Sequence, residues 1–196
     1  LPNREGAYDY SVLDGELPSR VAENLFWLGR NAERVELTAR LLRAACREMQ
    51  DEDSPFDQDG ATASLAALLR ATTAATGCKP GFTGRGGSRR LMRPDRELHS
   101  LLHDGDRAGT LCHALSTLQY SANAVRDRVS PELLLVLNDL ATHERRLRDA
   151  PARPALTRDP AVLIERCEFL DRLLGSLAAL AGLTHENFTH GDGWSF

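Results

Sequence analysis

The chain has 196 residues, 42% hydrophobic and 27% charged, which is long enough to bury the core of one domain without disulfides or a structural metal. A net charge of −4 and a sequence pI near 5.9 argue against a general nucleic-acid-binding protein. No apolar run approaches the roughly 18 residues of a membrane span. We therefore expect neither nucleic acid nor a membrane among its partners.

The type of hydrophobic residue predicts the fold class. The chain contains 32 Leu and 25 Ala but only 7 Val and 1 Ile. Leu and Ala favour helices, whereas strands favour β-branched residues. We therefore predict an all-α fold, an antiparallel bundle of five to six helices. Cys46, Cys112 and Cys167 fall within helical patterns and are interpreted as free thiols in the core, which suits a reducing, cytoplasmic location.

The first part of the chain predicts an arm followed by a long helix. Residues 1–17 show no helical period and are expected to be an arm or linker from a preceding domain, with one helical domain over 18–196. A helix is predicted to begin at Pro18-Ser19 and to end in the acidic turn at 51–55. Its apolar seam alternates spacings of four and three residues: Val21, Leu25, Leu28, Ala32, Val35, Ala39, Leu42, Cys46 and Met49.

The middle of the chain predicts a second, weaker helix over 61–76 and then a loop. Residues 77–94 contain five Gly, two Pro and four Arg, a composition typical of a flexible loop. Asp95 can cap a short helix, and a further heptad seam runs from Ala108 to Val129.

The last part of the chain carries two strong helix starts. Ser130-Pro131 and Asp159-Pro160 each place a capping side chain before a proline at the first helical position. The final helix is expected to end at Gly182, since glycine commonly follows the last helical residue.

One side of the long first helix carries an unusual mixture of residues. At about 100° per residue, a set of charges lies opposite the seam: Glu23, Arg30, Glu33 and Arg34. Phe26, Trp27 and Leu37 flank these charges. Because a solvated face seldom interleaves charges with so much Leu, Phe and Trp, we predict that the charges are half-buried beneath other helices and form one Glu–Arg network. Such a network is either a binding site or a structural device.

The same stretch, LPSRVAENLFWLGRNAER at 17–34, resembles the signature of the alpha-E domain family, a bacterial all-helical family named for a Glu-Arg motif, here Glu33-Arg34. Two further stretches are similar to the family and occur in the expected order: VRDRVSPE at 125–132, which leads to Leu137-Asn138, and GLTHENFTHGDGW at 182–194. They add these candidate residues: Arg126, Asp127, Asn138, His185, Glu186, Asp192 and Trp194. The family pattern continues beyond Trp194, so the resemblance implies a C-terminally truncated domain.

The resemblance implies a domain encoded beside, or fused to, an ATP-grasp protein that acts in peptide ligation or modification. The expected partner is the ATP-grasp ligase domain or its peptide substrate, and no catalytic residue, cofactor or metal is expected in this chain. We expect Arg30 and Arg34 to bind an acidic group of the partner. Glu33 is expected to orient Arg30, and Trp27 to line the site. Two alternatives remain: an enzyme with Glu33 as acid or base and Arg34 stabilising an anion, and a structural bundle that forms a homodimer.

Two other motifs are interpreted without a function. His185 and His190 are five residues apart, so one helix would point them about 140° apart, which disfavours a zinc site. Residues 84–88 follow no strand and open no clear helix, so they do not form a dinucleotide-binding fingerprint.

Overall fold

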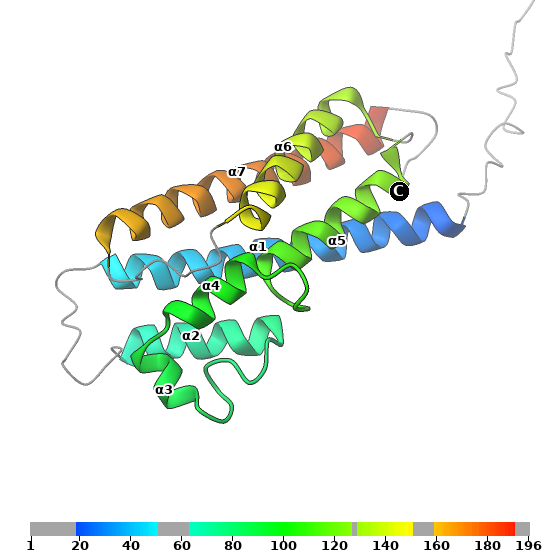
Figure 1. Ribbon diagram of the computed structural model, residues 1–196. Coiled ribbons are helices and arrows are strands. Elements are labelled where there is room, and N and C mark those ends of the chain that lie inside the picture. Colours follow the sequence, from blue (N-terminus) through cyan, green and yellow to red (C-terminus); the bar gives the residue numbers. More distant parts are fainter. Residues whose placement is uncertain (1–18, 51–62, 127–128, 151–158, 191–196) are drawn as a thin grey trace, which may run out of the picture.

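The computed structural model describes residues 19–50, 63–126, 129–150 and 159–190, without the side chains of 19 and 184–190. These residues form seven helices and no strand, which confirms the all-α prediction (Figure 1). The helices are α1 (Ser19–Gln50), α2 (Ala63–Thr76), α3 (Gly87–Met92), α4 (Asp95–His103), α5 (Leu111–Ala124), α6 (Pro131–Arg148) and α7 (Pro160–His190). The one unexpected helix is α3.

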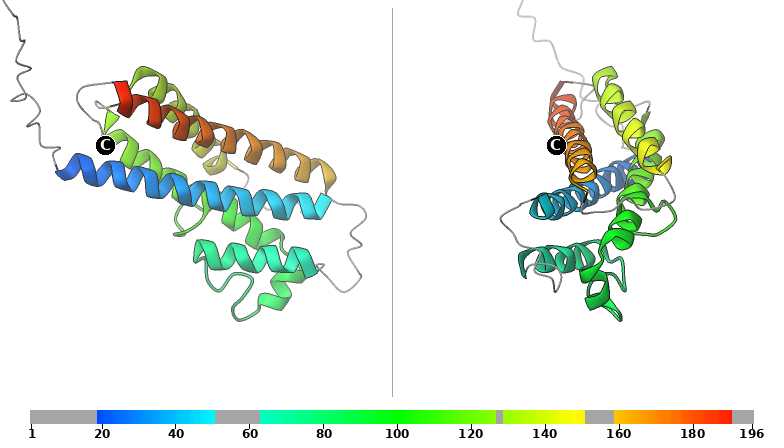
Figure 2. Two further views of the ribbon diagram at one scale, coloured as in Figure 1. Left: turned by 180° about the vertical axis from the view of Figure 1, so that it is seen from behind. Right: turned by 60° about the vertical axis from the view of Figure 1, so that its left-hand side comes forward.

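Helix α1 is the element around which the others are arranged. It contacts α2, α5 and α7, while α6 lies against α5 and α7. Seen from behind, α1 lies between α7 and α2, and it runs antiparallel to both (Figure 2). On the α7 side, Arg43 and Arg47 both reach Asp171, at 2.7 and 3.1 Å. The two arginines hold the pKa of this carboxyl below its usual range.

The seam predicted for α1 forms the centre of the core. Leu28, Val35, Ala39, Leu42, Cys46 and Met49 are buried, while Val21, Leu25 and Ala32 are partly buried against them. All four cysteines are free and buried, as expected for small core residues. The thiol of Cys78, outside the helices, donates a hydrogen bond to the Ala108 carbonyl at 3.4 Å.

Helices α6 and α7 begin directly after the capping residues that predicted them. The hydroxyl of Ser130 accepts a hydrogen bond from the Leu133 amide with Pro131 as the first helical residue, as predicted. Asp159 likewise accepts from the amide of Ala161, at 3.0 Å. The last helix does not end at Gly182 but continues to His190. Glycine costs a helix interior about 1 kcal/mol relative to alanine, which is too little by itself to terminate it.

Residues 77–94 form a folded connection, which corrects the prediction of a flexible loop. Phe82 and Leu91 are buried, and α3 occupies the C-terminal part of the segment. The Phe82 amide donates to the hydroxyl of Thr73 at 2.9 Å, so the connection folds back onto α2. This contact joins residues nine apart in the sequence and depends on how the chain folds back, which glycine content cannot reveal.

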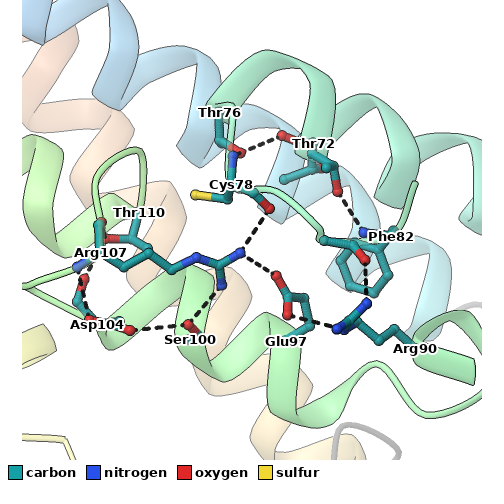
Figure 3. Close-up of polar contacts among 12 residues, drawn as sticks. Thr72, Thr76, Cys78, Phe82, Arg90, Glu97, Ser100, Asp104, Arg107 and Thr110 are labelled. Carbon is teal, nitrogen blue, oxygen red and sulfur yellow. Dashed lines mark hydrogen bonds and ion pairs between the residues drawn. The ribbon is translucent and has the colours of Figure 1, made fainter. Parts of the chain in front are cut away.

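Arg107 fastens this connection to α4 (Figure 3). Its guanidinium donates to the carbonyl of Cys78 and the carboxylate of Glu97, both at 2.8 Å, and to the Ser100 hydroxyl at 3.0 Å. The Glu97 side chain is only 12% exposed and also lies 3.7 Å from Arg90. The hydrogen bonds of Arg107 in this cluster join α4 to the connection within the protein, which suits a structural role.

Replacing Arg107 by Met is expected to lower the free energy of unfolding by about 2 to 3 kcal/mol, because a shielded carboxylate and a carbonyl lose their donor. The measurement is urea denaturation followed by circular dichroism. The matched control is Arg172→Met, which breaks an exposed pair with Glu168 at 2.9 Å and should cost less than about 0.5 kcal/mol. If the two variants lose equal amounts of unfolding free energy, the structural role of Arg107 is contradicted.

Candidate functional site

The charged side of α1 faces solvent among the described residues, which corrects the prediction that it is sheltered. Glu23, Arg30, Glu33 and Arg34 are all exposed. Gly29 has no atom within 4 Å of the position a Cβ would take, so no neighbouring backbone approaches it. The residues from Glu23 to Arg34 therefore present a surface and do not line an interior site.

The position of α2 explains this exposure. Helix α2 has 14 residues against 32 in α1, and it lies beside the C-terminal half of α1 only (Figures 1 and 2). Buried side chains are accordingly denser in the second half of α1, from Val35 to Met49, than in the first. The pattern of residues on α1 could not show how far its neighbour extends.

Arg30 and Glu33 form the ion pair expected from their spacing. The Arg30 Nη1 donates to Glu33 Oε2 at 3.0 Å, and the two side chains are 51% and 69% exposed. Glu23 and Arg34 make no ion pair with a described residue, so the predicted four-membered network is reduced to one pair.

Aromatic and aliphatic groups lie beside these charges. The rings of Phe26 and Trp27 meet edge to face with centroids 5.5 Å apart, and they are 61% and 42% exposed. Leu37, further along the same helix, is 49% exposed. Large apolar groups left open next to charged ones are typical of a protein interaction surface. We call Glu23, Phe26, Trp27, Arg30, Glu33, Arg34 and Leu37 the α1 surface.

Asn31 is a residue of this helix that the sequence analysis missed. It is 2% exposed, and its amide nitrogen has no hydrogen-bond partner in the described structure. Its position three residues after Leu28 and four before Val35 places it on the apolar seam. A polar side chain at such a position is the signal that could have identified it.

The described parts of the three stretches that carry the family resemblance include helix ends at one end of the bundle. The start of α1, the end of α5, the start of α6 and the end of α7 lie together there (Figure 1). Arg126 and Asn138 are exposed. The side chains of Asp127, His185, Glu186, Asp192 and Trp194 lie outside those described. The fold thus brings the candidate segments together, and their roles remain predictions.

A pocket of about 550 Å³ lies between α4, the end of α6 and the beginning of α7. Two histidines of α4, His99 and His103, line it with ring centroids 4.6 Å apart. The pKa of His103 is lowered to about 4, chiefly by burial and to a lesser extent by the neighbouring His99 and Arg166, while its hydrogen bond to the Leu147 carbonyl acts in the opposite direction. Both rings are therefore neutral near pH 7. None of the pocket residues was a candidate in the sequence analysis.

Two other kinds of site are absent from the described residues. Within them, no group of three or more His, Cys, Asp and Glu side chains is placed to hold a metal ion. No helix among them combines the length and apolar character of a membrane span.

Comparison with known proteins identifies one family and a few relatives. The family model Alpha-E, described as a predicted alpha-helical domain with a conserved ER motif, matches residues 17–196. Uncharacterized protein Rv2567 of Mycobacterium tuberculosis and uncharacterized protein Mb2597 of Mycobacterium bovis are each 30% identical to the chain over 200 residues. These alignments cover 99% of the chain but 21% of each relative, so the chain spans about a fifth of their length. No solved structure matches the chain.

We expect Glu33→Gln to change the free energy of unfolding by less than about 0.5 kcal/mol, because an exposed i, i+3 ion pair contributes little. Arg34→Lys should be equally mild. Urea denaturation of both variants provides the measurement. A loss above about 1.5 kcal/mol in either one would show that these side chains belong to a buried network after all.

The stability of the fold should fall as the pH is lowered from about 6.5 toward about 4, in part because of His103. Its folded-state pKa of about 4 lies below the ordinary value of 6.5, so in this window the unfolded chain binds a proton that the folded chain does not. Urea denaturation across the window should show a shallower decline for His103→Gln than for the unmodified chain. If the free energy of unfolding falls equally with pH in both proteins, the pH dependence does not come from His103.

Proposed function

The chain belongs to the Alpha-E family of helical domains, and from this premise we propose that it is a non-catalytic accessory domain of an ATP-grasp peptide-ligase system. In this proposal the α1 surface contacts the ligase domain or its peptide substrate. The observation that carries the proposal is the exposure of Phe26, Trp27 and Leu37 beside the unburied charges of α1. The link to ATP-grasp proteins comes from the resemblance of residues 17–34 to the family signature.

The chemistry of the α1 surface suits an acidic partner group. Arg30 and Arg34 are one helical turn apart on the same helix, so their guanidinium groups can approach one carboxylate. Glu33 holds Arg30 at 3.0 Å and thereby restricts its rotamers. Trp27 offers an indole for apolar contact, and Trp and Arg are the residues that most often dominate binding energy at interfaces.

The length of the relatives supports a role within a larger assembly. The matched segment makes up 21% of each mycobacterial protein, so in those proteins an Alpha-E segment is joined to much additional chain. A helical domain that works beside other domains needs a contact surface, and the end of the bundle where the three resembling segments meet includes the start of α1 (Figure 1).

The alternative of an enzyme centred on Glu33 is less well supported by the geometry. The Glu33 side chain is 69% exposed, and neither it nor Arg34 lines the pocket between α4, α6 and α7. General acid–base groups and anion-stabilising groups act most strongly where water is excluded. The exposed setting of Glu33 therefore favours recognition over catalysis.

The test is binding of the purified chain to the ATP-grasp ligase domain that the resemblance implies, fused or separate, measured by isothermal titration calorimetry. Trp27→Ala and Arg34→Glu are expected to weaken binding by about tenfold or more without changing the unfolding midpoint. The matched controls are Tyr120→Ala, an aromatic side chain of α5 that is 76% exposed, and Arg172→Glu on α7, and both should bind as the unmodified chain does.

Three outcomes would contradict the proposal. These are absence of binding, equal weakening by the control variants, and turnover of peptide and ATP by the isolated chain. Analytical ultracentrifugation addresses the remaining alternative, since a homodimer dissociated by Trp27→Ala would assign the α1 surface to self-association.

A further inference from the structure

The pocket between α4, α6 and α7 has the dimensions and walls of a small-molecule site. Its volume of about 550 Å³ falls within the range of typical ligand pockets. Leu102, Leu147, Val162 and Phe169 provide an apolar lining drawn from all three helices. It involves none of the residues of the α1 surface, so it is independent of the function proposed above.

Arg166 lines this pocket, and its charge has no partner among the described residues. Its Nη1 is buried with no hydrogen-bond partner, and the guanidinium makes no ion pair with any described residue. The other arginine of the pocket differs, because Arg146 donates to Glu165 at 2.8 Å and lies 5.3 Å over the ring of Phe169. A buried donor of a charged group left without an acceptor is costly, so Arg166 is suited to receive an anion.

The histidines of α4 lie near the charge of Arg166. Burial, and to a lesser extent the charge of Arg166, lowers the pKa of His99 and of His103, so both rings are uncharged at neutral pH. A bound anion would offset the Arg166 charge and stabilise the protonated form of either ring. The two rings can therefore report on what the pocket binds.

The acidic residues of the pocket restrict the charge of the anion. Asp149, at the end of α6, and Glu165, on α7, are both exposed side chains, and Glu165 is already engaged by Arg146. Two carboxylates at the opening disfavour a dianion such as phosphate by like-charge repulsion. A single carboxylate matches the fork of one guanidinium and can accept two parallel hydrogen bonds from it.

We propose that this pocket binds a small monocarboxylate with an apolar body, whose carboxylate pairs with Arg166 while the apolar body packs against Leu147 and Phe169. The same chemistry is offered by a free aliphatic or aromatic acid and by the C-terminus of a peptide that ends in an apolar residue. The pocket residues come from three helices of the folded bundle, so the site exists only in the intact domain.

The test uses 3-phenylpropionate and its uncharged analogue 3-phenylpropanamide as probes of the whole chain, titrated by calorimetry and by NMR. The acid should bind at least about tenfold more tightly than the amide, because only the acid forms the charge-assisted pair. In NMR spectra recorded near pH 7, the acid should also shift the ring resonances of His99 and His103, which line the pocket.

Two arginine variants of α7 distinguish binding of the acid in the pocket from nonspecific attraction to surface charge. Arg166→Gln should weaken binding of the acid by at least about tenfold. Arg172→Gln, which alters an exposed arginine paired with Glu168, should leave it within about twofold. The fold should tolerate Arg166→Gln, since the guanidinium has no described protein partner, and circular dichroism checks this. Arg166→Lys provides a second variant. It keeps the positive charge but loses the paired N–H donors of the guanidinium, so it should bind the acid with intermediate affinity.

The proposal is overturned if the acid does not bind, if the amide binds equally well, or if Arg166→Gln and the unmodified chain behave alike. N-acetyl-Ala-Phe, with a free or an amidated C-terminus, then distinguishes the two sources of the carboxylate. Tighter binding of the peptide acid than of 3-phenylpropionate assigns the pocket to peptide C-termini, and the reverse order assigns it to free acids.

Discussion

Burial of the α1 seam against three neighbouring helices is the interaction on which the rest of this structure depends. Val35, Ala39 and Ala45 are fully buried, and small residues there allow other helices to approach closely. Helices α2, α5 and α7 all pack on α1, so the position of each depends on its contacts with this one helix. Both the α1 surface and the pocket that α7 lines are therefore placed by this one packing arrangement.

Much of the fold could be predicted from local patterns. The excess of Leu and Ala over Val and Ile indicates helices, and the four-and-three spacing identifies the buried side of α1 correctly. Ser130-Pro131 and Asp159-Pro160 mark helix starts because a capping hydroxyl or carboxylate acts on amides only two or three residues away. In each of these cases the physical cause lies within one or two helical turns of the residue concerned.

The errors arise where the cause is distant in sequence. The charges from Glu23 to Arg34 are exposed because α2 is short and lies beside the other half of α1, which no pattern within α1 records. Phe82 is buried because the chain after α2 folds back to Thr73 and is fastened by Arg107. The pocket around Arg166 escaped prediction for the same reason, since its walls come from segments some sixty residues apart in the numbering.

The continuity of α1 has a thermodynamic consequence. The α1 surface and the more deeply buried second half of α1 belong to one uninterrupted helix, so the helical shape of the surface is continuous with the core. A molecule that recognises this surface only when it is helical must add its binding free energy to that of the whole domain. The melting temperature of the bundle, measured by calorimetry, should therefore rise when a partner occupies the α1 surface. Partners can be ranked by the size of this rise.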